Sequence, residues 1–389
     1  MSEKKSKILF VSHKANNSGA PLVLLSILKA FKQKTTVPFE VLCMEDGALV
    51  NEFSKLCKTY IWKVSGKEKK SFLDGFTKSL IRIRQILRGV YIISRLKGTR
   101  LIVYNTIANG HIQKKLAVTS AKHIYYVHEL EAAIQMLTNT EERKFLFEKT
   151  SAFLAVSHAV RSNLIASHGV PEENIITVAT PMQANHRTDF DHKDYRDKFK
   201  SLNGITNEII IGVLGAAEWR KGFDFFIPLV TIFFKRFPNA DVQFIWKGLK
   251  DDYMAFVNTY DFEKSGLQNK IKLLPHDQFA LETLACYDIH LLLSREDPYP
   301  LVMLEAASYS IPTICFQNAG GAPEFVGDDC GFTVPYGDLL AMADKLYELS
   351  TNTELRVRMG IASRQKLVQK HDEEKCMKAL TTIFLQSYN

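Results

Sequence analysis

The sequence has no apolar run of the roughly 18–20 residues that a helix needs to cross a bilayer. The apolar run near its start, ILFV, is far too short for a secretory signal, so none is expected there. Its six cysteines are scattered without a CxxC pair, which argues against a zinc site or a disulfide framework and fits a reducing cytoplasm. The absence of a G-x-G-x-x-G fingerprint argues against a dinucleotide cofactor.

Length and composition indicate a soluble globular protein of about two domains, with 389 residues of which 46% are hydrophobic and 24% charged. The net charge of +8 is unevenly spread. Residues 1–187 hold 28 Lys and Arg against 14 Asp and Glu, whereas the remainder holds 22 against 28. The basic first half suggests an anionic partner such as nucleic acid, a phosphorylated substrate or a membrane surface; the alternative is a solvated basic face.

Short strand-like apolar runs alternate with helix-like segments along the whole chain. The expected strands cover 7–13, 39–44, 101–106, 123–129, 152–157, 208–216, 242–248, 270–275, 289–294 and 312–316. The expected helices cover 20–31, 157–169, 222–236, 278–286, 300–309 and 338–350. This alternation predicts βαβ units and an α/β fold class with two Rossmann-like domains, each built on a parallel sheet.

A polar, charged stretch near 181–207 marks the predicted boundary between the two domains. We predict an N-terminal domain over 1–185 and a linker over 186–206 that includes at most a short solvent-facing helix. The second domain is predicted over 207–370 and a last amphipathic helix over 371–389.

One segment combines a strand end, acidic residues and a helix start. Ligands of open α/β sheets bind outside the carboxyl ends of the strands, and the strand 289–294 ends just before this segment. Pro300 suits the first turn of the helix that follows. Unpaired amides and the positive end of the helix dipole would make a site for a diphosphate there. These free donors, next to Tyr299, would be the amides of Leu301, Val302 and Met303.

Two carboxylates flank the expected diphosphate site. Asp297 precedes the helix and Glu305 lies about one turn into it, so each is placed to accept hydroxyls of a different sugar ring. The alternatives are an N-terminal helix charge for Asp297 and a solvent-facing residue for Glu305.

A family resemblance is carried by SREDPYPLVMLEAASYSIPTICF, together with NAGGAPEFV and GFTVPYGD, which follow it. These motifs resemble the nucleotide-sugar site of retaining glycosyltransferases of family 4, the group 1 glycosyltransferases with the GT-B fold. That family carries two acidic residues separated by seven others, as are Asp297 and Glu305. Its first acidic residue is usually Glu, so Glu296 could share the role of Asp297. The resemblance implies that Glu305 binds the ribose hydroxyls and Asp297 the transferred sugar.

A second motif, GVLGAAEWRKGFDFF, resembles the phosphate loop of the same family. Lys221 matches its diphosphate-binding Lys. The family's Arg is replaced by Ala216, and Arg220 is near enough to substitute for it. Fixed cations are needed here because the leaving nucleoside diphosphate gains negative charge in the transition state.

Two shorter matches lie in the first half of the chain. Gly19 and Ala20 fall in the loop that the family places near the donor phosphate, although a tight turn would explain them equally well. His128, in YYVHELEAA, matches a His that faces the transferred sugar, with a purely structural role as the alternative.

The resemblance implies two domains facing across a cleft, an acceptor-binding one and a nucleotide-sugar-binding one, with the last helix crossing back to the first. It implies transfer of a sugar from a nucleoside-diphosphate donor to a hydroxyl of a saccharide or lipid-linked acceptor, with retained configuration, in bacterial polysaccharide or lipopolysaccharide synthesis. His128, Lys221 and Asp297 would be catalytic. No cofactor is expected, and no metal, since a DxD cluster is missing. Alternatives are a sugar-nucleotide epimerase of the same fold, or a non-enzymatic protein that binds anions or membranes; carboxylates at the rim argue against nucleic acid.

A basic amphipathic helix is predicted over 78–100, where Lys and Arg alternate with Ile, Leu and Tyr. Such a helix is typical of peripheral contact with an anionic membrane, which would place the protein at the inner face of the cell membrane. The alternative is a domain helix whose apolar side packs in the core.

Overall fold

The computed structural model describes residues 6–17, 19–63, 75–117, 119–182, 192–249 and 253–389. The chain divides into two compact units, of which the first comprises Met1–Pro181 with Glu374–Asn389 and the second Met182–Glu373. No helix within the described ranges is both long enough and apolar enough to span a membrane.

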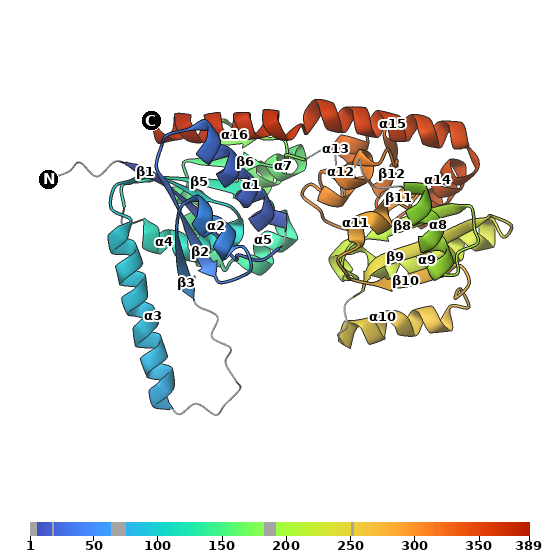
Figure 1. Ribbon diagram of the computed structural model, residues 1–389, viewed down its shortest axis with the longest axis horizontal. Coiled ribbons are helices and arrows are strands. Elements are labelled where there is room, and N and C mark those ends of the chain that lie inside the picture. The colour runs from blue at the N-terminus through green and yellow to red at the C-terminus, as the bar shows by residue number, and fades with distance from the viewer. Residues whose placement is uncertain (1–5, 18, 64–74, 118, 183–191, 250–252) are drawn as a thin grey trace. The chain divides into compact units, whose positions relative to one another are not determined.

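The first unit is built on a seven-stranded sheet in which every pair of neighbours is parallel (Figure 1). Its strands, in their order across the sheet, are β3 (Lys58–Lys63), β2 (Phe39–Glu45), β1 (Lys7–Ser12), β4 (Thr99–Tyr104), β5 (Lys122–Val127), β6 (Ala152–Ala155) and β7 (Ile175–Thr177). Its helices are α1 (Gly19–Lys34), α2 (Val50–Leu56), α3 (Gly75–Arg95), η1 (Ile107–Asn109), α4 (Gly110–Leu116), α5 (Glu131–Leu137), α6 (Thr140–Lys149), α7 (His158–His168), η2 (Glu172–Asn174) and α16 (Glu373–Tyr388).

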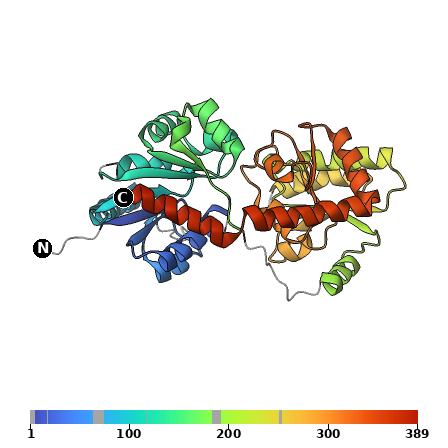
Figure 2. The same cartoon turned by 90° about the horizontal axis from the view of Figure 1, so that it is seen from above.

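The last helix, α16, packs on the strands at the beginning of the chain (Figure 2). The ring of Phe384 meets that of Phe10 edge-on at 5.6 Å, and the Tyr388 hydroxyl donates to the carbonyl of Ser6 at 2.9 Å. Phe10 also contacts Phe31 of α1, so α16 closes the apolar core of the first unit.

The second unit is built on a six-stranded parallel sheet. Its strands, in order, are β10 (Ile271–Pro275), β9 (Val242–Leu249), β8 (Ile209–Leu214), β11 (Ile289–Leu292), β12 (Thr313–Phe316) and β13 (Gly331–Val334). Its helices are α8 (His192–Leu202), η3 (Trp219–Lys221), α9 (Phe223–Arg236), α10 (Tyr253–Lys264), α11 (Ala280–Leu284), α12 (Leu301–Ser308), α13 (Ala322–Val326), α14 (Leu339–Thr351) and α15 (Thr353–Lys370).

Both sheets have the doubly wound strand order, in which the chain starts in the middle and builds outward first on one side and then on the other. The order reverses between β1 and β4 in the first unit and between β8 and β11 in the second. In sheets of this order, ligands bind outside the carboxyl ends of the strands at the point where the order reverses. The fold class predicted from the alternating pattern is confirmed.

Every predicted strand run overlaps a strand of the structure, but β3, β7 and β13 were not predicted. All three have exposed or half-buried residues, and β7 and β13 are also short, so their sequences lack a continuous apolar run. The helix predicted at 157–169 is confirmed with its ends: Ser157 accepts from the Val160 amide, and Gly169 closes the helix in the left-handed conformation.

Part of the predicted linker over 186–206 packs on the second unit instead of standing free. Helix α8 buries Phe199, which lies in one apolar cluster with Ile205 and Tyr287. α8 is therefore anchored on one side rather than wholly solvent-facing. One aromatic residue in a charged stretch is a weak sequence signal, yet it is enough to dock a three-turn helix.

Candidate functional site

The predicted helix start is present, with one correction to its free donors. α12 begins after Pro300, which has no side-chain capping bond. The Met303 amide donates to the Pro300 carbonyl at 3.2 Å and is not free. Among the residues that the structure describes, the amides of Leu301 and Val302 have no recorded acceptor. The first turn of α12 therefore presents two donors rather than three to an anion.

Lys221 and Asp297 meet at the switch point of the second sheet. Lys221 follows β8, Asp297 follows β11, and the Lys221 Nζ lies 2.5 Å from the Asp297 Oδ2. Asp297 is only 6% exposed. An ammonium and a carboxylate thus stand side by side at the start of α12, one suited to phosphate oxygens and the other to sugar hydroxyls.

The backbone of Asp297 is tied to the loop after β12. Its amide donates to the Ala319 carbonyl at 2.8 Å, and its carbonyl accepts from the Gly321 amide at 3.0 Å. Gly320 lies between them with φ +115°, and a Cβ there would approach the Asp297 carbonyl oxygen to 1.9 Å. Only glycine fits such a contact, so Gly320 lets the loop after β12 pack directly against the backbone of Asp297.

The turn that carries Lys221 is pressed onto the same loop. η3 ends at Gly222, whose φ is +77°, and a Cβ on Gly222 would meet the Leu293 carbonyl oxygen at 2.1 Å. Arg220 points its guanidinium at the Glu296 carbonyl (3.1 Å) and at the Glu218 carboxylate (3.2 Å). Of the two candidate acidic residues, Asp297 is the one whose carboxylate contacts Lys221, and Glu296 contributes its backbone to Arg220.

Glu305 is largely buried in α12, and burial raises the pKa of its carboxyl from 4.5 to about 7. Within the described ranges no hydrogen-bond partner is recorded for this carboxyl. Tyr299, predicted beside the donors, shares a hydrogen bond between its hydroxyl and the Nε2 of His371 at 2.8 Å. The Tyr299 hydroxyl is therefore bonded to the residue that ends α15, whereas the Glu305 carboxyl is not engaged in this contact.

In the first unit, a hydrogen-bonded network joins the start of α1 to the end of β5. The Asn105 side chain donates to the carbonyl of Ala20 at 2.7 Å. The neighbouring Thr106 hydroxyl bonds to the Glu129 carboxyl, which also accepts from the amides of Ile107 (3.2 Å) and His128 (3.0 Å). Burial raises the pKa of Glu129 from 4.5 to about 7. Ala20 and His128 are thus held on one rim, while Gly19, the first residue of α1, is exposed.

His128 lies against Tyr126, with ring centroids 4.1 Å apart. Its Nε2 is buried and has no partner among the described residues. Burial, with His13 nearby, lowers the pKa of His128 to about 3, so the imidazole is neutral at physiological pH. An unsatisfied nitrogen at a strand end costs free energy, and a ligand hydroxyl would satisfy it.

Several polar groups at these rims were not predicted from the sequence. Asn105 and Thr106 follow β4. In the sequence they could have been found as a polar pair directly after the apolar run LIVY. Lys247 lies inside β9, is almost fully buried and places its Nζ 2.5 Å from the Asp277 Oδ2. In the sequence, Lys247 could have been found as a lysine within the apolar run VQFIWKG. In the described part of the chain, no three His, Cys, Asp or Glu side chains are grouped as metal ligands would be.

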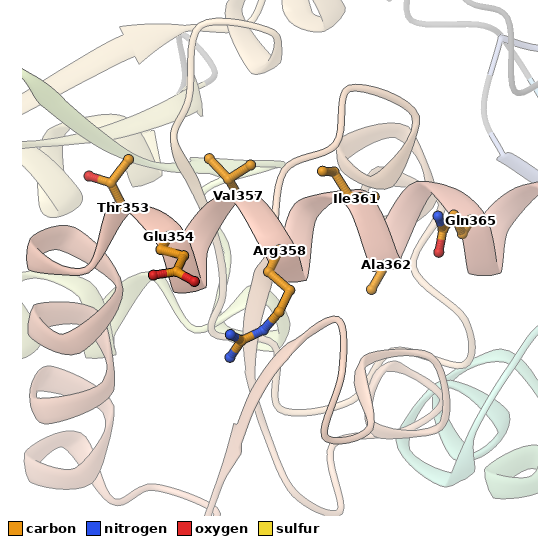
Figure 3. A pocket seen from close by; sticks show the side chains of 7 residues that line it. All are labelled: Thr353, Glu354, Val357, Arg358, Ile361, Ala362 and Gln365. Atoms are coloured by element: carbon orange, nitrogen blue, oxygen red, sulfur yellow. The ribbon is translucent and has the colours of Figure 1, made fainter.

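An open depression of about 540 Å³ on α15 contains none of the predicted site residues (Figure 3). It is lined by Thr353, Glu354, Val357, Arg358, Ile361, Ala362 and Gln365. Only side chains of a single helix line it, and they offer no convergent polar groups of the kind that orient a small ligand.

The second unit matches a known family. Residues 194–366 match the model of "Glycosyl transferases group 1". N-acetyl-alpha-D-glucosaminyl L-malate synthase of Bacillus anthracis is 30% identical over 119 residues, which are 30% of this chain and 31% of that protein. The capsular polysaccharide biosynthesis glycosyltransferase CapM of Staphylococcus aureus is 22% identical over 250 residues, 62% of this chain and 64% of that protein. The matches thus span from about a third to just under two thirds of these relatives.

Solved structures of similar fold cover almost the whole chain. HepE of Anabaena, solved in complex with UDP, gives a TM-score of 0.78 with 17% identity over 98% of this chain and 100% of that one. Sucrose-phosphate synthase of Thermosynechococcus elongatus gives 0.76 with 13% identity over 98% of both chains. At this identity the likeness establishes the fold. The chain thus has the two-sheet GT-B fold, and its residues 194–366 match the model of the group 1 glycosyl transferases.

Proposed function

We propose that the protein is a glycosyltransferase that moves a sugar from a nucleoside-diphosphate donor to a hydroxyl of an acceptor. The observation that carries the proposal is the pairing of Lys221 with Asp297 beside the free amides of Leu301 and Val302. The Lys221 ammonium and the two amides are suited to bind a diphosphate. The Asp297 carboxylate is suited to accept hydrogen bonds from the hydroxyls of the attached sugar.

The chemistry follows from what each group can do. The bond from the sugar to the diphosphate breaks, and negative charge grows on the leaving phosphate. The acceptor oxygen forms the new bond to the sugar and gives its proton to an oxygen of that phosphate. Lys221 and the start of α12 would stabilise that charge. Asp297 would hold the sugar, and Glu305 would bind the ribose hydroxyls. The family resemblance supports transfer with retention of configuration and without a protein nucleophile.

We further propose that the first unit takes the acceptor at the rim where α1, β4 and β5 meet. His128, neutral and with an unpaired Nε2, would contact a sugar hydroxyl there. A saccharide or lipid-linked acceptor in bacterial polysaccharide synthesis fits this role, and CapM, one of the relatives, is named for capsular polysaccharide biosynthesis.

The direct test is a thermal-shift screen of UDP-, GDP- and ADP-sugars, with UDP first because HepE was solved with UDP. A ligand at about 100 times its dissociation constant stabilises a protein by roughly 2.7 kcal/mol, which is easily measured. Stabilisation by one nucleotide class supports the donor site, and none by any class contradicts it. Conversion of the sugar nucleotide without any acceptor would favour an epimerase.

Peripheral membrane contact is proposed from α3, which runs beside β3 (Figure 1). Residues 75–128 contain ten Lys and Arg and no Asp or Glu. On α3 the exposed apolar residues recur every three or four positions and share one face, more than half exposed: Ile83, Ile86, Leu87, Val90 and Tyr91. Arg84 and Arg88 flank this face, whereas Ile92 and Leu96 are buried. An exposed apolar face with a basic border fits an anionic lipid surface.

A further inference from the structure

We infer that Arg295 is a positioning residue that fastens the turn carrying Lys221 to the loop carrying Asp297, and so sets the distance between the two groups. The inference rests on the proposed function, because it concerns the same site. Arg295 lies in the motif SREDPYP, but its role is indicated by its contacts and not by the sequence.

The planar Arg295 guanidinium donates hydrogen bonds to residues on both sides of the turn that carries Lys221. Nη1 donates to the Asp224 Oδ1 at 2.7 Å and Nη2 to the Oδ2 at 2.6 Å, while Nη1 also donates to the Trp219 carbonyl at 2.6 Å. Asp224 lies in the first turn of α9, directly after the turn that holds Lys221. The Arg295 side chain is therefore bonded to one residue before Lys221, which is Trp219, and to one residue after it, which is Asp224.

Packing holds the guanidinium in this orientation. Its carbon lies 4.8 Å from the centre of the Trp219 ring and 4.0 Å from that of Phe225. The Arg295 side chain is only 11% exposed. Aromatic faces on a cation and partial exclusion of water both strengthen the pair with Asp224, beyond what an exposed ion pair contributes.

Two further hydrogen bonds, both to backbone carbonyls, connect the loop of Lys221 to the loop of Asp297. The Arg295 amide donates to the Arg220 carbonyl at 2.8 Å, and the Arg220 side chain returns a bond to the Glu296 carbonyl at 3.1 Å. Lys221 follows Arg220 and Asp297 follows Glu296, so each site residue is adjacent to a bonded neighbour. The Lys221–Asp297 pair itself is a further link between the two loops.

The planar guanidinium of Arg295 fixes a geometry that a lysine ammonium at the same position could not fix. A lysine at 295 could reach one carboxylate oxygen but could not hold Asp224 and the Trp219 carbonyl together. A site displaced by about 1 Å can lose on the order of 10²-fold in turnover. We therefore expect the site to depend on arginine at this position and not merely on positive charge.

The experiment compares Arg295→Gln and Arg295→Lys with a matched control, Arg236→Gln. Arg236 makes the same kind of two-pronged contact to Asp344 (2.9 and 3.1 Å), on the same unit but between α9 and α14. Binding of UDP is measured by calorimetry well below the melting temperature, and amide exchange is followed over residues 218–224. We expect both Arg295 variants to bind UDP about tenfold more weakly or worse and to exchange faster, with Arg236→Gln unchanged.

Asp224→Asn serves as a second variant if the Arg295 variants do not fold, because it keeps the shape and removes the charge. Unchanged UDP affinity and unchanged exchange in folded Arg295→Gln or Asp224→Asn would overturn the inference. If the wild-type protein binds no UDP, GDP or ADP, the proposed function fails instead. Exchange over 218–224 then still decides whether Arg295 fixes the Lys221 turn.

Discussion

The Lys221 ammonium lies 2.5 Å from the Asp297 carboxylate, although the two residues are 76 positions apart in the chain. The strand order of the second sheet brings them together, because β8 and β11 are neighbours at the point where that order reverses. Each residue partly neutralises the other, and a donor with both a diphosphate and a sugar can engage both at once.

Replacing the two members of this pair should affect nucleotide binding differently. Lys221→Met removes the cation that stabilises the leaving diphosphate, so we expect weaker UDP binding and a loss of roughly 10²–10³-fold in transfer rate. Asp297→Asn frees Lys221 for the phosphates, so UDP should bind as tightly as before or more tightly while transfer falls. Calorimetry with UDP and a transfer assay check this, and equal weakening of UDP binding in both variants would contradict it.

Glu305→Gln should weaken UDP binding through the ribose. We expect 2′-deoxy-UDP to bind the wild-type protein less tightly than UDP, and this difference to shrink in the variant, since an amide oxygen accepts from the hydroxyl more weakly than a carboxylate does. Glu354→Gln, on exposed α15, is the control. A 2′-hydroxyl effect of the same size in Glu305→Gln would remove the ribose assignment.

Glu129 makes the stability of the first unit depend on pH. Its pKa is raised from 4.5 in the unfolded chain to about 7 in the folded protein, so the folded state holds the proton more firmly. The resulting stabilisation is complete below pH 4.5 and is lost as the pH rises through 7, by at most about 3 kcal/mol.

In Glu129→Gln the amide carbonyl can still accept the backbone N–H bonds but no longer titrates. The decline in melting temperature between pH 5 and 8 should therefore be shallower than in the wild type, with exposed Glu173→Gln as the control. Identical slopes in all three proteins would show that Glu129 is ionised throughout.

His128 should not titrate in the physiological range. Burial and the nearby His13 lower its pKa to about 3, so its ring signals in ¹³C-histidine NMR should stay constant from pH 8 to 5. The signal is assigned by its absence in His128→Gln. In urea the same ring should titrate near 6.5, the value for an exposed histidine. An inflection near 6.5 in the folded protein would mean that the ring is open to water.

Vesicle flotation tests the basic helix α3. We expect more protein to float with vesicles containing phosphatidylglycerol than with phosphatidylcholine alone, and less in high salt, because the basic part of the attraction is screened. The double variant Ile86→Asn/Leu87→Asn should lose most of this binding, whereas Val357→Asn/Ile361→Asn, another exposed apolar pair, on α15, should not. Equal flotation with neutral vesicles removes the proposal.

The sequence was most informative where local rules dominate. Alternating apolar runs predicted both sheets, because buried parallel strands are apolar along their whole length. Ser157 and Gly169 marked the ends of α7 correctly. The carboxylates of the loop 294–306 were found through spacing and a family resemblance, and the structure places Asp297 against Lys221.

Contacts between distant segments left no local signal. Arg295 and Asp224 are 71 residues apart, and a forked ion pair between two loops has no periodicity to detect. Met303 was predicted as a free donor because the pattern shows where a helix starts but not that its first turn closes on Pro300. On α3 the apolar face is exposed rather than packed, and periodicity alone does not distinguish these two cases.

Helix α16 has a consequence for biosynthesis. The first unit needs residues from Glu374 on, which leave the ribosome only after all of Met182–Glu373 has been made. At about 5–20 residues per second, the early strands wait on the order of 10–40 s with Phe10 uncovered. The domain that is synthesised first is thus completed last, and until then the apolar surface that α16 will cover is open to chaperones.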